Sequence, residues 1–500
     1  MPRIVKRILT VLSGLLIALQ AAGAMAGVVA PDVQDAVRTL APDAEVPVII
    51  RLSETVDLKS FTDKDKAVRS SKIIKALIDR KDRTQKDLLK FLKNNKVKDP
   101  LSLWIINGIA ARVPVSLVDE LANLPSVERV TLDAVVTLPP EPVVAGLGGT
   151  GATNPGDNII DVGVPELWTL GYQGTGSVVG VMDTGVDASH PDIEPRYRDG
   201  PNSWKDLVNG DNTGPYDDHG HGTQVTGIIV GGEASPSGTA IGVAPGAQWI
   251  AVKVFDASAK STLSRLHQGF EWLFDPDSDP NTPDYPDIIN NSWYIEGTEG
   301  SYNSEFRDNI QVLNDAGIAV VFAAGNSGTA GDVSPANDPG SFAVGAVDWN
   351  LNIASFSSRG PSSYDGSFYP HVSAPGVAVL TAHPGAGYTF ETGTSFAAPH
   401  VVGALALLGA TMTGASVSQL LQALKESAVD LGTPGPDNSY GYGLLNAMSA
   451  YDWLLTHVGS PFDSDGDGDV DGNDLAVYSA AATSENLAAF AYGFGRNASQ

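Results

Sequence analysis

The chain has 500 residues, of which 42% are hydrophobic and 18% charged, a composition typical of a globular protein with two to four domains. It contains no cysteine, which excludes a disulfide framework and thiol chemistry. The formal net charge is −27, and residues 141–500 hold 42 acidic but only 10 basic side chains. This part of the chain is expected to repel nucleic acids and anionic membranes, so we predict no nucleic-acid partner.

The N-terminus has the pattern of a secretory signal peptide. Arg3, Lys6 and Arg7 precede the apolar residues 8–19, and Ala24-Met25-Ala26 fits a small-x-small cleavage site. The apolar run is too short for a good membrane span. We therefore predict a signal peptide over residues 1–26 and a secreted, extracellular protein with no stable membrane anchor.

Residues 27–140 have the pattern of a separate small α+β domain. Apolar runs predict strands over residues 46–52, 103–113 and 127–131, and apolar residues at helical spacing predict helices over 63–95 and 116–123. The helix over 63–95 is strongly basic. We interpret it as a solvated face that complements the acidic part of the chain, rather than as a patch that binds nucleic acid.

Residues 141–156 are predicted to form an exposed linker, because the stretch from Pro139 to Gly156 is rich in proline and glycine. Beyond it, residues 157–457 alternate short apolar runs with helical patterns. We predict buried strands over 178–182, 249–254, 288–291 and 318–323, and helices over 263–273, 305–315, 395–408 and 417–427. This alternation is typical of an α/β domain with a parallel sheet, in which catalytic groups gather at the carboxyl ends of the strands.

Three short motifs carry the chemistry. Asp183 lies in Val181-Met182-Asp183-Thr184-Gly185, His221 begins His221-Gly222-Thr223-Gln224-Val225-Thr226-Gly227, and Ser395 lies in Gly393-Thr394-Ser395-Phe396-Ala397-Ala398-Pro399-His400. A serine hydroxyl needs a base to become a nucleophile, and a histidine base needs an anion to hold its tautomer. Each residue alone has a structural explanation, as a turn or a helix cap, but the set predicts nucleophilic catalysis by Ser395.

The three motifs and their order resemble those of the subtilisin-like serine proteases, the subtilase family. The resemblance implies a subtilisin-like parallel sheet with helices on both faces. It also implies a serine endopeptidase that cleaves polypeptide substrates through an acyl-enzyme, with Asp183, His221 and Ser395 as its triad. In this family an Asn in the context Ala323-Ala324-Gly325-Asn326 helps to stabilise the oxyanion, which gives that role to Asn326.

The segment 288–294 resembles the strand with which the family binds substrate backbone. The residues expected to contact substrate are therefore Ser292, Trp293, Tyr294, Ala324 and Gly325. Residues 257–263 are the expected opposite edge of the cleft. We expect an apolar or aromatic residue on the acyl side of the cut, and Asp332 leaves a basic residue open.

Residues 103–111 and 127–130 resemble the propeptide inhibitor domain that precedes many subtilisins. The resemblance implies that residues 27–140 act as an intramolecular inhibitor of an autoinhibited precursor. Its C-terminal tail is then expected to lie in the active site until it is cut. Self-cleavage is expected within residues 133–156.

Residues 460–500 are predicted to form a short helical calcium-binding module. The residues expected to bind calcium (Ca²⁺) are Asp463, Asp465, Asp467, Asp469, Asp471 and Asp474, with Gly468 at the sixth position of the loop, where the backbone turns sharply. The loop resembles that of a dockerin, which implies a cohesin-like partner. Dockerins have two such loops, and only one is recognisable here.

Two further acidic segments remain open as metal sites. Asp192, in His190-Pro191-Asp192, matches a calcium ligand of many subtilisins, but the loop over 231–239 that completes that site in the family is altered. Asp275, Asp277 and Asp279 form an acidic loop for which calcium binding and a surface loop without a ligand are equally good interpretations.

The sequence disfavours three alternative functions. A catalytically inactive extracellular adhesion or scaffold protein with a protease-like fold is disfavoured by the complete set of Asp183, His221, Ser395 and Asn326. The related acid peptidases use Glu in place of the histidine base, and His221 in its Gly-Thr context disfavours this alternative. An esterase nucleophile is expected in Gly-x-Ser-x-Gly, which the residues around Ser395 do not match.

Overall fold

The computed structural model describes residues 27–142, 156–235, 238, 240–481 and 487–495. The predicted signal peptide and most of the predicted linker lie outside the described residues. The chain forms two compact units, one of residues 1–55 and 80–134 and a larger one of residues 56–79 and 135–500. The structure therefore groups residues 56–79 and 135–140, predicted to belong to the N-terminal domain, with the larger unit.

The smaller unit is an α+β structure with a five-stranded sheet in the order β1-β5-β2-β4-β3. Its strands are β1 (Val28–Val29), β2 (Glu45–Leu52), β3 (Leu101–Leu103), β4 (Gly108–Pro114) and β5 (Val127–Leu132). Its helices are α2 (Pro31–Thr39), α4 (Val118–Ala122) with the 3₁₀ turn η2 (Val115–Leu117) before it, and the second half of α3 (Lys66–Asn94). Apolar residues of these strands and helices, among them Val48, Ile50, Leu88 and Leu92, form its core.

The single strand predicted over residues 103–113 is wrong. The structure has two antiparallel strands there, β3 and β4, with Leu103 opposite Gly108. Asn107 adopts a left-handed backbone with a φ of 49°, which Asn tolerates better than most residues. The turn from Trp104 to Asn107 therefore reverses the chain inside an apolar run, where periodicity alone gives no sign of a turn.

The larger unit is built on a seven-stranded sheet in the order β14-β13-β12-β11-β7-β9-β8, and every neighbouring pair is parallel. The strands are β7 (Val178–Asp183), β8 (Trp204–Asp206), β9 (Gln248–Lys253), β11 (Ile288–Asn291), β12 (Ala319–Ala323), β13 (Phe342–Val347) and β14 (Val372–Pro375). The four buried strands expected from the sequence are confirmed as β7, β9, β11 and β12. Sequence analysis missed β8, β13 and β14.

Helices cover both faces of this sheet, because successive side chains of a strand point to opposite sides. From β12, Val321 belongs to the same core as Val225 of α7 (His221–Val230) and Leu405 of α10 (Thr394–Thr411). The next residue, Phe322, faces the other way and contacts Trp293, which packs against Phe270 of α8 (Leu263–Phe274). The helix α9 (Arg307–Ala316) contacts α8 and β12 on that side. The predicted α/β subtilisin-like architecture is confirmed.

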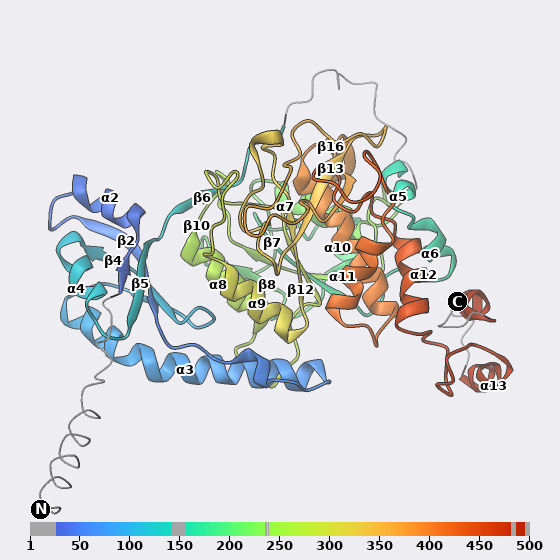
Figure 1. The fold of residues 1–500 in the computed structure, drawn as a ribbon, viewed down its shortest axis with the longest axis horizontal. Helices are drawn as coiled ribbons and strands as arrows, with labels where there is room; N and C mark the ends of the chain where they lie inside the picture. Colours follow the sequence, from blue (N-terminus) through green and yellow to red (C-terminus); the bar gives the residue numbers. More distant parts are fainter. Residues whose placement is uncertain (1–26, 143–155, 236–237, 239, 482–486, 496–500) are drawn as a thin grey trace, which may run out of the picture. The chain divides into compact units, whose positions relative to one another are not determined.

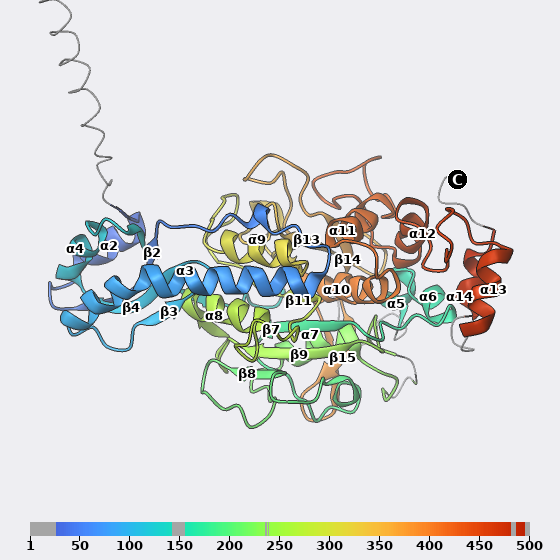
Figure 2. The same cartoon turned by 90° about the horizontal axis from the view of Figure 1, so that it is seen from below.

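Shorter elements complete the unit. The helices are α5 (Asp157–Asp161), α6 (Pro165–Thr169), α11 (Val417–Glu426) and α12 (Ala447–His457), and the 3₁₀ turns are η1 (Leu58–Ser60), η3 (Glu194–Arg196) and η4 (Gly328–Ala330). Two small antiparallel pairs are β6 (Val135–Thr137) with β10 (Lys260–Thr262), and β15 (Val379–His383) with β16 (Gly387–Glu391). Figures 1 and 2 both show α10, in orange, beside α11.

Among the described residues, α10 alone is long and apolar enough to cross a membrane, and 83% of that helix is buried inside the unit. A central helix of an α/β core has this property because side chains surround it on all sides. Its first turn holds Ser395, so the predicted nucleophile lies on a deeply buried helix of the unit.

The first half of α3 belongs to the larger unit and is held there by polar contacts. Lys66 forms a 2.7 Å ion pair with Asp287, and Ser70 donates a hydrogen bond to the Ala316 carbonyl at the end of α9. Lys75 donates to Asn281 over 2.6 Å. These contacts agree with the interpretation of the basic helix as complementary to the acidic part of the chain.

Residues after α12 form a small helical module with α13 (Gly472–Ala481) and α14 (Leu487–Gly493). Its apolar centre is the buried Val470 and the stacked rings of Tyr478 and Phe490, whose centroids are 4.3 Å apart. Tyr492 donates a 2.7 Å hydrogen bond to Asp452 of α12.

Candidate active site

Asp183 and His221 meet in the core of the larger unit. Asp183 is the last residue of β7, and His221 is the first residue of α7. The Nδ1 of His221 lies 2.8 Å from Oδ1 of Asp183, and both side chains are buried. The Thr184 N–H also donates to Oδ1 of Asp183, over 2.7 Å, which leaves this carboxylate one orientation toward the ring.

The charge state of His221 is set by a competition. Burial alone lowers its pKa, but the negative charges of Asp183, Glu141 and Asp217 and the hydrogen bond to Asp183 outweigh burial. The pKa of His221 is therefore raised above its ordinary value. An imidazole in this setting holds a proton readily, which is what a general base must do in the transition state.

Ser395 is the second residue of α10, directly after Thr394 and the N-cap residue Gly393. Its Oγ donates a 3.2 Å hydrogen bond to the Ser292 carbonyl, and within the described residues no hydrogen bond joins it to His221. The ring of the next residue, Phe396, packs against the His221 ring with centroids 5.6 Å apart. Catalytic hydrogen bonds are often long before substrate binds, so the geometry is compatible with a pairing of Ser395 and His221.

The side-chain amide of Asn326 has a defined orientation. Its Oδ1 accepts two hydrogen bonds from Thr394, one from the backbone N–H over 3.0 Å and one from the hydroxyl over 2.8 Å. Because a backbone N–H can only donate, the oxygen must face Thr394, and the NH₂ group is the other end. A Cβ on Gly393 would lie 3.5 Å from that nitrogen, so glycine keeps the space in front of the amide open.

The expected substrate-binding residues are only partly brought to this site. Ser292 contacts Ser395 in both directions, because its hydroxyl also donates to the Ser395 carbonyl over 2.8 Å. The Trp293 side chain is fully buried among Phe306, Phe322 and other rings. The Trp293 side chain therefore belongs to the core, and only the backbone of this residue is placed to line a cleft.

The remaining members of this set lie close to Asn326. Tyr294 is buried, and the pKa of its phenol is raised by burial, against hydrogen bonds from Ser327 and the Asn326 backbone. The Gly325 N–H donates to the Thr394 hydroxyl, and the Ala324 carbonyl accepts a 2.6 Å hydrogen bond from Tyr369. Gly325 has a φ of 98°, and a Cβ there would lie 2.8 Å from Val333, so glycine is required.

Asp332 is the residue for which a contact with a basic substrate side chain was left open. It is buried, and its carboxylate already has hydrogen-bond donors. Its carboxylate accepts hydrogen bonds from Asn337 and from both the backbone and the hydroxyl of Ser363. A carboxylate with these donors gains little from a substrate cation.

Comparison with known proteins agrees with this geometry. Residues 174–443 match the model of the subtilase family, Peptidase_S8, which is more than half of the chain. The chain belongs to the subtilase family. It is 36% identical to subtilisin DY of Bacillus licheniformis over 289 residues, which cover 94% of that protein and 57% of this chain. It is 34% identical to subtilisin E of Bacillus subtilis over 352 residues, 81% of that protein and 69% of this chain.

This subtilase is also 36% identical to Bacillopeptidase F of Bacillus subtilis over 442 residues, 81% of this chain. The chain spans only 30% of the length of that relative. The family and these relatives make the chain a serine-type endopeptidase.

Residues 135–142 of this subtilase approach the expected edge of the cleft and Gly393, and the strand β6 in this segment was not predicted from the sequence. The strand β6 pairs antiparallel with β10, with Val136 opposite Ser261, and the Leu138 N–H donates to the Ala259 carbonyl over 2.9 Å. Residues 257–263 were expected to form one edge of the cleft, so β6 lies where a substrate strand is expected. Further along, Pro142 comes within 3.6 Å of the position that a Cβ on Gly393 would take.

Glu141 lies beside His221 in the same segment and faces Glu391 of β16. Burial, the hydrogen bond with Glu391 and the charge of Glu391 raise the pKa of Glu141 to about 7, and His221 opposes this only in part. Glu391 is held by 2.8 Å and 2.9 Å hydrogen bonds from Gln224 and Thr389. Glu141 therefore keeps its proton up to near-neutral pH. A single sequence has no signal for this pair, since its members are 250 residues apart.

Lys253 is another residue that sequence analysis missed. It is fully buried at the end of β9 and donates to the carbonyls of Thr184 and Phe255 and, over 2.6 Å, to Asp218. These contacts fix the chain directly after Asp183. The sequence signal that could have identified Lys253 is a lysine inside an apolar strand, because burial of an ammonium group is unfavourable unless the group is paired.

Asp192 does not join other acidic groups in the described part of the chain. Its two carboxylate oxygens accept hydrogen bonds from the Ala234 N–H over 2.6 Å and from the Tyr388 hydroxyl over 2.8 Å. These donors already satisfy the buried carboxylate, so nothing in the geometry requires a calcium ion at Asp192.

The six aspartates predicted to bind calcium lie together in the loop before α13. They fall into two groups with close ligand atoms, Asp463 with Asp465 and Asp467, and Asp469 with Asp471 and Asp474. Gly468, at the sixth loop position, has a φ of 96°, as the sharp turn of such a loop requires. Asp469 Oδ1 is buried and has no hydrogen-bond partner among the described residues, so a cation ligand role fits it.

Proposed function

We propose that Asp183, His221 and Ser395 are the catalytic triad of this endopeptidase. The observation that carries the proposal is the buried 2.8 Å contact between His221 Nδ1 and Asp183 Oδ1, next to the helix whose first turn holds Ser395. In the reaction, Ser395 Oγ attacks the scissile carbonyl and His221 Nε2 takes the hydroxyl proton. Asp183 stabilises the imidazolium that forms.

The proposed tetrahedral intermediate has a negative oxygen that needs donors in place. Two are near Ser395, its own N–H and the Asn326 amide, whose nitrogen end is free because Thr394 holds the oxygen end. His221 then gives its proton to the leaving amine, and an acyl-enzyme on Ser395 remains. A water molecule, deprotonated by His221, attacks this ester, and collapse of the second intermediate returns the proton to Ser395.

A serine-directed phosphonate tests this proposal directly. We expect the processed native protein to gain one phosphonate group, and peptide mapping to place it on Ser395. The inactive adhesion or scaffold protein, the alternative function, predicts no labelling of Ser395 in folded protein. Labelling elsewhere, with Ser395 unmodified, would contradict the proposed triad.

We further propose that the chain is made as an autoinhibited precursor in which residues 135–142 obstruct the site. Support comes from the β6–β10 pairing and from the positions of Glu141 and Pro142 near His221 and Gly393. In this proposal residues 27–140 are a propeptide, and the chain is cut within residues 133–156. Secretion is part of the proposal and rests on the pattern of residues 1–26.

The Glu141–Glu391 pair predicts that release of this segment depends on pH. Docking raises the pKa of Glu141 from 4.5 to about 7. Below pH 4.5 the carboxyl is protonated whether docked or free, so docking carries no penalty. Between pH 4.5 and 7 docking becomes progressively less favourable, and above 7 the penalty is complete. We therefore expect purified precursor to gain activity against a chromogenic peptide faster at pH 8 than at pH 6.

Replacing Glu141 removes the titrating group. In Glu141→Gln the amide is neutral at every pH and can still donate to Glu391, so we expect slower activation at pH 8 and a smaller difference between pH 6 and pH 8. Glu128→Gln, on the exposed face of β5, is the matched control and should behave as the parent chain. Equal pH dependence in both variants would exclude a role for Glu141.

We also propose that the loop of residues 463–474 binds calcium, with carboxylates from the two groups of aspartates as ligands. The ion would supply charge neutralisation and fix the loop against α13, a structural role with no part in the reaction. A cohesin-like partner for this module remains a prediction. In the sequence, no second acidic loop of the dockerin type precedes α14.

A further inference from the structure

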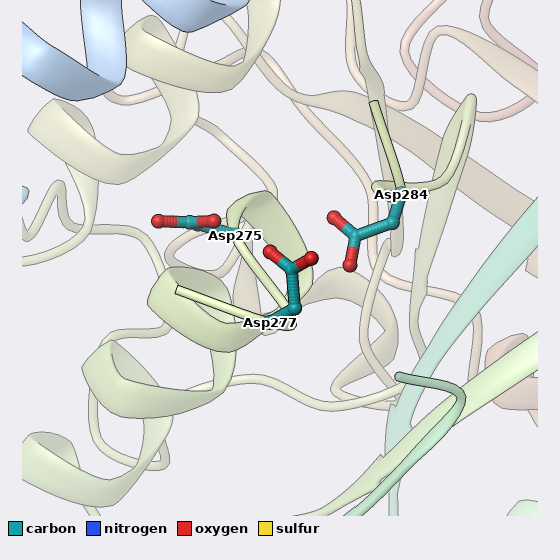
Figure 3. A group of neighbouring side chains, drawn as sticks. All are labelled: Asp275, Asp277 and Asp284. Atoms are coloured by element: carbon teal, nitrogen blue, oxygen red, sulfur yellow. The ribbon is translucent and has the colours of Figure 1, made fainter. Parts of the chain in front are cut away.

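A third acidic cluster lies away from both the catalytic residues and the C-terminal loop. It consists of Asp275, at the end of α8, Asp277, in the turn that follows, and Asp284, in the segment that leads into β11. One carboxylate oxygen from each residue lies within 4.8 Å of the others. Figure 3 shows the carboxylates of Asp277 and Asp284 turned toward one another, with Asp275 beside them.

Three carboxylate oxygens of this cluster are buried and have no hydrogen-bond partner among the described residues. Asp275 and Asp284 are only 8% and 9% exposed, and Asp275 Oδ1 and both carboxylate oxygens of Asp284 are buried without a partner. An unpaired buried carboxylate is strongly unfavourable, since it loses the solvation of its charge and receives no compensation. Three buried acceptor atoms that converge on a third carboxylate therefore require a cation or protons.

The nearest protein cation does not fill this role. The guanidinium of Arg198 donates to the backbone carbonyls of Asp284 and Asn202, over 2.7 Å and 2.8 Å, and to the Ser203 hydroxyl. It thus faces the cluster from the segment after η3, but its donors are directed to other oxygens. Asp279 is close in sequence, but its side chain accepts the hydrogen bonds of Asn281.

We propose that Asp275, Asp277 and Asp284 bind a calcium ion that joins the end of α8 to the start of β11. The cluster offers only oxygen ligands, which suit a hard cation rather than zinc or copper. Calcium–oxygen distances of about 2.3–2.6 Å place oxygens on opposite sides of the ion about 5 Å apart, which the observed separation fits.

Protons are the competing occupants. Burial, together with the charge of Asp277, raises the pKa of Asp275 and of Asp284 to about 6. The loop also leads through β11 to Ser292, which contacts Ser395, so the ion would stiffen the support of the substrate-binding strand.

The test is a count of bound calcium on the full chain at pH 8. Every protein carries Ser395→Ala to prevent self-digestion, so the result does not depend on the proposed catalytic function. Equilibrium dialysis measures bound calcium for the parent, for Asp284→Asn, and for a double variant of the C-terminal loop, Asp463→Asn with Asp465→Asn. Thermal unfolding with calcium, with magnesium and with a chelator is recorded for each protein.

We expect Asp284→Asn to lose about one calcium ion per chain and to keep the calcium bound by the C-terminal loop. Its unfolding temperature with the chelator should equal or exceed that of the parent, because the neutral amide relieves the unpaired buried charge, while its gain from calcium should be smaller. Asp277→Asn, at an exposed position, is a second variant that is expected to fold and to weaken the same site. Unchanged calcium binding in both variants, or equal stabilisation of the parent by magnesium, would overturn the proposal.

Discussion

Replacing the proposed nucleophile is expected to have the largest effect on activity. Ser395→Ala removes the only atom that can form the acyl-enzyme, and we expect kcat to fall by about 10⁶-fold, the loss found for the corresponding change in subtilisin, a member of this family. Activity that remains would come from oxyanion stabilisation and binding alone. The measurement is kcat and KM against a chromogenic peptide, for protein whose fold is verified by its unfolding temperature.

Processing gives an independent readout of the same variant. Intact mass and N-terminal sequence, recorded after expression with calcium, should show that the native chain loses residues up to a point within 133–156 while Ser395→Ala stays whole. Ser418→Ala, on the exposed face of α11, is the control and should be processed normally. If both the native chain and Ser395→Ala are cut at the same place, the cut is made by another protease and self-processing is excluded.

The second largest effect is expected for Asp183→Asn. The amide has nearly the same shape but no charge, so it stabilises neither the imidazolium of His221 nor the tautomer that the base requires. We expect kcat to fall by about 10⁴-fold. The change should have little effect on KM, since Asp183 is buried behind His221 and does not reach substrate.

The pH profile distinguishes this role from a structural one. Asp183 raises the pKa of His221, so Asp183→Asn should lower the pKa that governs the acidic limb of kcat/KM. A change that only loosened the fold would leave this limb in place and lower the unfolding temperature. Asp365→Asn, in an exposed loop, is the control and should retain both the rate and the profile. A normal rate for Asp183→Asn would remove Asp183 from the triad.

Part of the fold was predictable because its signal is local. Apolar runs over 178–182, 249–254, 288–291 and 318–323 identified β7, β9, β11 and β12, because strands of a parallel sheet are buried on both faces. The strands β13 and β14 were missed. Their sequences, Phe342–Val347 and Val372–Pro375, contain glycine, serine and proline, which weaken the pattern, and only their neighbours in the sheet make them strands.

The candidate site likewise has residues that local sequence motifs indicate and residues that only the fold places. Asp183, His221, Ser395 and Asn326 were proposed from their motifs, because a small-residue context around each of them is local in the chain. Trp293 was expected near substrate from its neighbours in sequence. Strand alternation and the packing of Phe306 and Phe322 turn its side chain into the core instead, which no local pattern expresses.

The sequence by itself determined the family, the α/β class, the side chains proposed to react and the positions of several central strands and helices. These features depend on residue types at short spacing. Only the tertiary structure decided which distant groups meet: Glu141 with Glu391 beside His221, Asn326 with Thr394, and Asp275 with Asp284. The physical reason is that burial and charge interact through space, so the pKa of a carboxyl group and its need for a cation depend on neighbours that the fold supplies.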